Sequence, residues 1–152
     1  MISSTAMSRT CSRELVAIGI DIVEISKVRD LLSYGTRRVK RVFNPSELAV
    51  VGKTAPPAAN RSLIRRMACV FAVKEAVFKS LGRGWGQGMR WSEVSVAREE
   101  GGRWSVSLRG QVLRRLRALG GDRVETCVST TGNHAIAQAF IYKIPNPKTS
   151  SI

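Results

Sequence analysis

The sequence is short of acidic residues, aromatic residues and histidine, and each shortage narrows what the chain can do. Eleven Asp and Glu stand against 25 Lys and Arg, which gives a formal net charge of +14 over 152 residues. This excess indicates an anionic partner, and nucleic acid, acidic protein, nucleotide and anionic lipid all qualify. Aromatic residues make up only 6% of the chain, so nucleic-acid bases would find few rings on which to stack. A basic nucleic-acid-binding module is therefore an alternative function, but one that the low aromatic content disfavours.

The sequence also lacks the residues of a soft-metal site and the long apolar run of a membrane span. Cys11, Cys69 and Cys127 are far apart with no CxxC pair, and His134 is the only histidine. No apolar stretch approaches the ~20 residues that cross a bilayer. The first fourteen residues lack the apolar centre of a secretory signal, so we expect a cytoplasmic protein with no membrane partner.

The length and composition predict one domain with unstructured ends. We expect a disordered extension over residues 1–14, a folded domain over 15–142 and a flexible tail over 143–152, where the chain turns polar and contains prolines. No internal repeat is evident.

Apolar periodicity predicts an α+β fold in which a small antiparallel sheet packs on one long and several short helices. A β-rich run over 15–22 leads into helical spacing over 25–32, and Asn44-Pro45-Ser46-Glu47 is typical of a helix start. Two prolines among alanines predict a loop over 52–60. A long helix is expected over 62–81, closed by Gly82. The second half predicts strands over 91–96, 103–108, 123–129 and 135–142, with a helix over 111–119.

Two carboxylates have unusual surroundings for charged groups. Asp21 ends an apolar run, where burial is costly without a partner, although capping the next helix is an alternative role. Glu75 lies in the long helix, and Phe71, Glu75 and Lys79 share one face because they are four residues apart. The alternative for Glu75 is an exposed pair with Lys79, which adds only ~0.3–0.5 kcal/mol to helix stability.

Two hard carboxylates from separate segments suit Mg²⁺, which prefers oxygen ligands and completes its shell with water and substrate phosphates. The glycine-rich stretch over 82–88 follows the long helix directly. Its backbone N–H groups are able to hold a phosphate, although such a loop is as often a flexible connector. Asp21 and Glu75 are therefore the candidate metal ligands.

Two segments resemble the signature motifs of the holo-[acyl-carrier-protein] synthases, within the 4′-phosphopantetheinyl transferase superfamily. They read Ile18-Gly-Ile-Asp-Ile-Val-Glu-Ile25 and Phe71-Ala-Val-Lys-Glu-Ala-Val-Phe-Lys-Ser-Leu-Gly82. Either motif alone is moderately specific, and both in this order are strong. The resemblance extends from about residue 15 to residue 142.

The resemblance implies transfer of 4′-phosphopantetheine from coenzyme A to a serine of an apo acyl carrier protein, with release of adenosine 3′,5′-bisphosphate. Asp21 and Glu75 would ligate Mg²⁺ beside the pyrophosphate, and Glu75 would help to take the serine proton. Charge neutralisation and positioning suffice for such a phosphoryl transfer. The residues implied in binding coenzyme A are Lys74, Lys79, Gly82, Arg83 and Gly84.

The resemblance also gives the positive charge a use, since the family grips an acidic helix of the carrier protein with basic residues. The residues that match this surface are Lys27, Arg29, Arg37 and Arg41. A solvated basic face is the alternative for any one of them. A homotrimer with active sites between subunits is also implied, as is a role in fatty acid biosynthesis.

Three positions depart from the family pattern. Val70 stands where an arginine is usual, Gly132 falls in a stretch that often carries a histidine, and Arg83 replaces a threonine. Because the first two changes affect the side that meets the nucleotide part of coenzyme A, donor affinity is in question. Arg83 is a candidate for restoring the lost phosphate contact. A relative that has lost transfer activity and only binds carrier protein is therefore the second alternative.

Overall fold

A computed structural model of the chain describes residues 13–33, 36–49, 60–82 and 88–145. Within these ranges no helix is long and apolar enough to span a membrane. In chain order the elements are β1 (Glu14–Glu24), α1 (Ile25–Ser33), α2 (Thr36–Val42), α3 (Pro45–Ala49), α4 (Arg61–Ser80), the 3₁₀ turn η2 (Trp91–Glu93), β2 (Val94–Arg98), β3 (Trp104–Leu108), α5 (Gly110–Ala118), β4 (Arg123–Thr130) and β5 (His134–Lys143).

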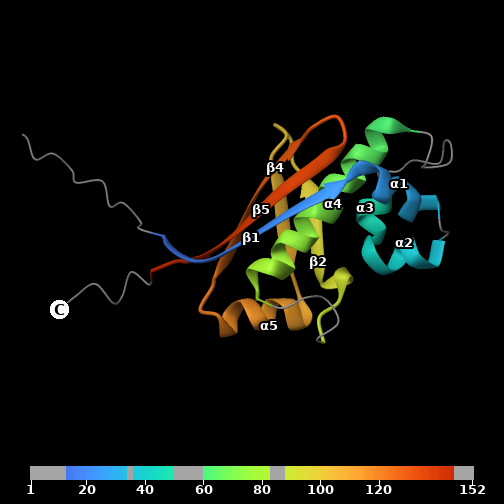
Figure 1. Cartoon of the computed structure of the whole chain (residues 1–152). Helices are drawn as coiled ribbons and strands as arrows, with labels where there is room; N and C mark the ends of the chain where they lie inside the picture. Colours follow the sequence, from blue (N-terminus) through green and yellow to red (C-terminus); the bar gives the residue numbers. More distant parts are fainter. Residues whose placement is uncertain (1–12, 34–35, 50–59, 83–87, 146–152) are drawn as a thin grey trace, which may run out of the picture.

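Two antiparallel sheets and one long helix organise the molecule, which confirms the predicted α+β class. The larger sheet has the order β1-β5-β4, and β2 pairs with β3 in a separate hairpin. Helix α4 packs against the β1-β5-β4 sheet, while α1, α2 and α3 gather beside one end of α4 and α5 lies near its other end (Figure 1). The long helix therefore connects the parts of the fold.

The strands of the larger sheet alternate between a buried and an exposed side. In β5 the side chains of Ala135, Ala137 and Ala139 are fully buried against the core. On β1 the alternate residues Ile18, Ile20 and Ile22 are exposed. Because successive side chains of a strand point to opposite faces, β1 presents Gly19 and Asp21 toward α4 and a row of isoleucines outward.

A glycine sets the distance between β1 and α4. A Cβ atom on Gly19 would lie 2.0 Å from the backbone oxygen of Ala76 and 2.4 Å from the backbone nitrogen of Ser80. Both are backbone atoms of a helix, which cannot give way as a flexible side chain can. Only glycine therefore allows β1 to approach α4 this closely, two residues before Asp21.

Capping at both ends fixes the length of α4. The Asn60 side chain accepts a hydrogen bond from the backbone N–H of Leu63 at 3.1 Å. Asn60 is therefore the N-cap, and the helix begins at Arg61. At the other end Gly82 has φ +68° and donates its N–H to the Lys79 carbonyl at 3.0 Å. The predicted helix and its glycine terminus are both confirmed.

The structure corrects one strand and adds one helix. Residues Trp91–Glu93 form the η2 turn, and β2 begins only at Val94. Trp91 turns inward because its ring packs at 5.2 Å from those of Phe71 and Phe78. Helix α2 was not predicted, since its basic sequence has little apolar periodicity. The predicted loop over 52–60 lies, except for residue 60, outside the described residues.

Candidate active site

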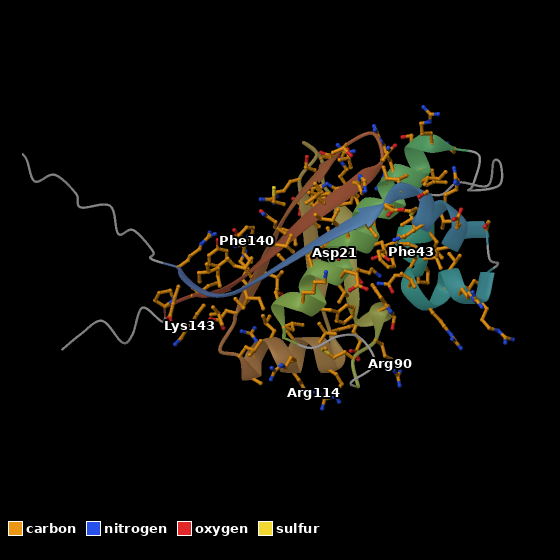
Figure 2. All side chains as sticks on the ribbon, viewed as in Figure 1. Asp21, Phe43, Arg90, Arg114, Phe140 and Lys143 are labelled. Carbon is orange, nitrogen blue, oxygen red and sulfur yellow. The ribbon has the colours of Figure 1, made fainter. Side chains whose placement is uncertain are left out.

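Strand β1 and helix α4 bring Asp21 and Lys79 together. The Lys79 ammonium donates to Oδ1 of Asp21 at 2.7 Å, and only 11% of the Asp21 side chain is exposed. Within the described ranges, Oδ2 of Asp21 is buried and has no hydrogen-bond partner. Figure 2 shows Asp21 where β1 passes over α4. A buried carboxylate oxygen without a partner is costly, so it marks a place where a ligand is able to compensate.

Glu75 completes the cluster one helical turn before Lys79. Its side chain is partly buried. Burial raises the pKa of the Glu75 carboxyl, and the Asp21 carboxylate raises this pKa further, against the opposing effect of the Lys79 ammonium. Two carboxylates that repel each other beside one ammonium are an arrangement that a further cation stabilises. The structure thus brings Asp21, Glu75 and Lys79 together, as the sequence predicted.

The donor set fits magnesium better than a soft metal. Among the described residues no group of three or more His, Cys, Asp or Glu side chains lies together. Asp21 and Glu75 therefore offer two carboxylates, and Mg²⁺ is commonly held by one or two carboxylates plus water and substrate phosphates. The unpartnered Oδ2 of Asp21 is the atom best suited to such an ion.

The prediction that Lys74 binds coenzyme A does not agree with the structure. Its side chain has no exposed surface and forms an ion pair of 2.8 Å with Glu47 of α3. The ammonium also donates to the backbone oxygens of Val42 and Trp91, at 2.8 and 3.3 Å. Burial lowers the pKa of Lys74, although Glu47 opposes this shift. Lys74 therefore holds α2, α3 and η2 against α4 and has no donor to offer a ligand.

The predicted donor-binding loop is only partly covered. Gly82 is exposed at the end of α4, one turn beyond Lys79, while Arg83 and Gly84 lie outside the described residues. Of the atoms in the described residues, a Cβ atom on Gly82 would meet the Arg115 guanidinium alone, at 3.8 Å.

The predicted carrier-protein surface lies on α1 and α2. Lys27 and Arg29 are exposed on α1, and Arg37 and Arg41 are exposed on α2. Lys27 contacts Glu24 at 3.4 Å and Arg29 contacts Asp30 at 3.6 Å, so part of the α1 charge is balanced locally. The two helices also contact each other. All four predicted residues are thus accessible on neighbouring elements.

Neither Val70 nor Gly132 lines the hollow that has three arginines. Val70 is buried in the core, and Gly132, in the turn between β4 and β5, lines a different hollow together with His134. The hollow with three arginines has a volume of about 330 Å³, and its lining includes Arg65, Arg66 and Arg98 and, of the described residues, no carboxylate. Its other polar lining residues include Ser62, Ser129 and Thr130. Sequence reasoning missed this hollow because its arginines come from α4 and β2, at no recognisable spacing.

The geometry of Asp21, Glu75 and Lys79 agrees with what comparison with known proteins finds. The family model described as the 4′-phosphopantetheinyl transferase superfamily matches residues 17–139. The chain belongs to this superfamily. The matched span of the superfamily model contains residues 17–24 of β1 and the whole of α4, and so all three residues of the cluster.

Members of this superfamily with curated names are similar over most of the chain. The holo-[acyl-carrier-protein] synthase of Koribacter versatilis is 31% identical over 84% of this chain and 98% of its own length. That of Acidithiobacillus ferrooxidans is 36% identical, over 84% of this chain and 95% of its own length. The crystal structure of holo-ACP-synthase from Plasmodium yoelii, at 24% identity, covers 88% of this chain and 99% of that chain with a TM-score of 0.74, which shows a shared fold.

Proposed function

We propose that this chain is a holo-[acyl-carrier-protein] synthase, which transfers the 4′-phosphopantetheine group of coenzyme A to a serine of apo acyl carrier protein and releases adenosine 3′,5′-bisphosphate. The observation that carries this proposal is the Asp21–Lys79 contact at 2.7 Å beside Glu75, built by β1 and α4 from the two signature segments. Relatives of 31 and 36% identity that bear this name support the same reaction.

In this proposal Asp21 and Glu75 hold a Mg²⁺ ion, which when bound neutralises charge on the donor pyrophosphate. Oδ2 of Asp21, which has no partner among the described residues, would hold the ion, while Oδ1 keeps the Lys79 ammonium in place. Lys79 is about half exposed, so its ammonium is able to contact a phosphate oxygen as well as Asp21. Glu75 would accept the proton of the attacking serine, directly or through a water.

The hollow with three arginines supports donor binding despite the loss of the usual arginine and histidine. Arg66 and Arg98 form no ion pair among the described residues, and the Arg65 guanidinium donates to the Thr131 carbonyl at 2.9 Å. Guanidinium groups bind phosphate in forked geometry. We therefore assign the phosphate at the nucleotide end of coenzyme A to this hollow. Arg83, proposed from the sequence for this contact, lies outside the described residues.

We propose acidic acyl carrier proteins as the protein substrate, held by Lys27, Arg29, Arg37 and Arg41. Their exposure on α1 and α2 and the chain's net charge of +14 support this assignment. A cytoplasmic location and a role in fatty acid biosynthesis follow from this substrate, and cell fractionation with an antibody to the chain would test the location.

We further propose a homotrimer in which sister subunits cover the outer face of the β1-β5-β4 sheet. Ile18, Ile20 and Ile22 are 50, 49 and 61% exposed, which is unusual for a row of large apolar side chains. Phe140 lies opposite Ile18 in the register and extends the row across β5 (Figure 2). Light scattering should give about three times the 16.7 kDa of one chain, and an Ile20→Lys variant should dissociate. A monomeric wild-type chain would end this proposal.

The reaction is tested by incubating the purified chain with apo acyl carrier protein, coenzyme A and Mg²⁺, and then weighing the carrier protein by mass spectrometry. Transfer of the phosphopantetheine arm adds about 340 Da to the carrier protein. EDTA should abolish the gain, since Asp21 and Glu75 need a divalent cation to bring the pyrophosphate near two carboxylates. A carrier protein whose attacked serine is replaced by alanine is the matched control.

Two other functions give different results in the same assay. A relative without transfer activity would bind the carrier protein and leave its mass unchanged, and Val70 and Gly132 would then be the first positions to revert. A nucleic-acid-binding module would bind oligonucleotides with an affinity that falls with salt and ignores Mg²⁺. Either result in place of the mass gain would overturn the proposed reaction.

A further inference from the structure

Arg115 of α5 places a guanidinium group at the carboxyl end of α4, the end that carries Lys79. Its Nε donates to the backbone oxygen of Leu81 at 3.1 Å. Its terminal nitrogen lies 3.8 Å from the position that a Cβ of Gly82 would occupy. Leu81 caps the carboxyl end of α4, so Arg115 meets the helix at its last turn.

The end of α4 brings this guanidinium to the last turn of the helix, which also carries Lys79. Phe71, Glu75 and Lys79 share one face of α4, which ends at Ser80 with Leu81 as its C-cap. Gly82 follows this cap with φ +68° and has no side chain of its own. Arg115 lies beside the empty Cβ position of Gly82, three residues after Lys79 in the chain.

The free donors of Arg115 are suited to an anion. Among the described residues no carboxylate forms an ion pair with Arg115, and only its Nε has a hydrogen-bond partner. The side chain is half-buried, which strengthens its interactions relative to a fully solvated guanidinium. The carboxyl end of a helix carries partial negative charge that would repel a phosphate, and a guanidinium at this end offsets that repulsion.

Helix α5 is held firmly enough to keep Arg115 in this position. The Glu93 carboxylate accepts hydrogen bonds from the backbone N–H groups of Gln111 and Val112, at 3.2 and 3.3 Å, and so caps the start of α5. Arg109 donates to the Ser92 carbonyl at 3.1 Å. Helix α5 is therefore fixed to η2 at its start and to α4 through Arg115.

We propose that Arg115 binds a phosphate group of the pyrophosphate-bearing donor, as a second cation beside Lys79 at the carboxyl end of α4. This role rests on the proposed function, because it assumes that the donor pyrophosphate lies at Asp21, Glu75 and Lys79. Arg115 is a donor-binding residue in this proposal, and its Nε bond to Leu81 orients the fork so that the other nitrogens face the ligand.

The test compares the full-length chain with the variants Arg115→Gln, Arg115→Lys and Arg114→Gln. Arg114 is the matched control because it is the preceding arginine of α5 and is exposed on the outer side of that helix (Figure 2). The KM for coenzyme A and kcat are measured at saturating apo carrier protein and Mg²⁺, the Kd of coenzyme A is measured by calorimetry, and a melting temperature is recorded for each variant.

Arg115→Gln should raise the KM and the Kd for coenzyme A at least about tenfold, as expected for loss of a charge-assisted contact, with kcat changed much less. Arg115→Lys should give an intermediate KM, because one ammonium cannot both hold the Leu81 carbonyl and reach a phosphate. Arg114→Gln should stay within about twofold of wild type, the scale of a screened surface charge.

The outcomes separate this proposal from the proposed function. Suppose that the wild-type chain transfers phosphopantetheine, and that Arg115→Gln has an unchanged KM and only a lower melting temperature. The synthase assignment would then stand, and Arg115 would serve only to hold α5 against α4. If Arg115→Gln does not fold, Arg115→Lys decides, and an unchanged KM in that variant overturns the role. A wild-type chain that neither binds coenzyme A nor modifies a carrier protein ends both proposals.

Discussion

Helix α4 takes part in two lysine–carboxylate pairs of nearly equal length that differ in every other respect. Lys74 pairs with Glu47 at 2.8 Å, and the two side chains are 0 and 1% exposed. Lys79 pairs with Asp21 at 2.7 Å, and these side chains are 53 and 11% exposed. The two lysines are five residues apart in the same helix, so the difference comes from what surrounds each pair.

The pairs differ in how completely their polar atoms are satisfied. Glu47 also accepts hydrogen bonds from the backbone N–H groups of Asn44 and Val96, and Lys74 fills its remaining donors with two carbonyls. In the other pair, within the described part of the chain, one oxygen of Asp21 has no partner. A saturated pair holds a fold together, whereas an unsaturated pair retains the capacity to bind.

The largest expected effect follows from neutralising the Asp21 carboxylate of the unsaturated pair, or the neighbouring carboxylate of Glu75. Asp21→Asn and Glu75→Gln should each lower turnover at least about 10³-fold, because the metal and the donor pyrophosphate lose a ligand, while the fold is kept. Steady-state rates with circular dichroism as the folding control measure both. Glu99→Gln, in the exposed turn between β2 and β3, should leave the rate unchanged. Near-normal rates in both site variants would remove the metal assignment.

Breaking the saturated pair should unfold the protein more readily. Lys74→Met should lower the free energy of unfolding by about 3–5 kcal/mol, because Glu47 is left buried without its cation. The matched variant Lys79→Met leaves the Asp21 carboxylate, which is 11% exposed, without its cation, so it should also lower this free energy. The loss should be smaller than in Lys74→Met, because water reaches the pair from the 53% exposed side of Lys79, and most activity should be lost. Urea unfolding measures both values. Equal losses of stability in the two variants would erase the distinction between the pairs.

The Glu75 carboxyl should make stability depend on pH when no metal is present. Its pKa is raised in the folded state, chiefly by burial, so the folded chain binds this proton more tightly than the unfolded chain. The stabilisation is complete below the unfolded pKa and is lost as pH rises through the raised pKa. In EDTA, Glu75→Gln should therefore gain stability over wild type at pH 8 and gain less at pH 5. An equal difference at both pH values would contradict this assignment.

Added Mg²⁺ should also offset the loss of stability that the ionised Glu75 carboxylate causes at pH 8. It should raise the melting temperature of the wild-type chain at pH 8 and leave that of Glu75→Gln nearly unchanged, since binding to the folded state stabilises it. This readout does not depend on turnover, so it tests the metal site even if the carrier protein is the wrong one.

The smallest effect concerns charges that lie outside both pairs. Arg37→Glu or Arg41→Glu should raise the KM for an acidic carrier protein by up to about tenfold at low salt, and the effect should shrink as salt screens it. Arg114→Glu changes the net charge equally on α5 and is the control. If all three variants respond alike, the carrier protein senses net charge and not the surface of α1 and α2.

The sequence predicted that Asp21, Glu75 and Lys79 belong to one site, because they lie in regular elements with clear periodicity and match two family motifs. It did not predict that Lys79 pairs with Asp21, which only the packing of β1 on α4 shows. A strand that ends in a carboxylate and a helix with Glu75 and Lys79 on one face leave little freedom once the two elements pack. The fold class and the end of α4 at Gly82 were predictable for the same reason. Local pattern and tertiary packing agree in this part of the chain.

The sequence was insufficient where a role depends on which distant element covers a residue. Lys74 and its neighbour Glu75 match the family motif equally well. Only the packing of α3 shows that the Lys74 ammonium forms an ion pair with Glu47. Trp91 has strong strand propensity, but two phenylalanine rings of α4 draw it into a turn. Arg115 meets Gly82 only because α5 folds back on α4, at a separation that no motif encodes.

Strand β1 has a consequence for regulation because its two faces serve different purposes. Under the proposed function, its inward residues Gly19 and Asp21 position the metal and donor site, and its outward isoleucines form the face that we assign to sister subunits. A change of subunit contact would shift the same backbone that positions Asp21. Oligomer formation and donor affinity would then be thermodynamically linked, so that coenzyme A strengthens the trimer by the same factor by which the trimer strengthens coenzyme A binding. An enzyme built in this way would lose affinity on dilution with no change to any residue that contacts the substrate.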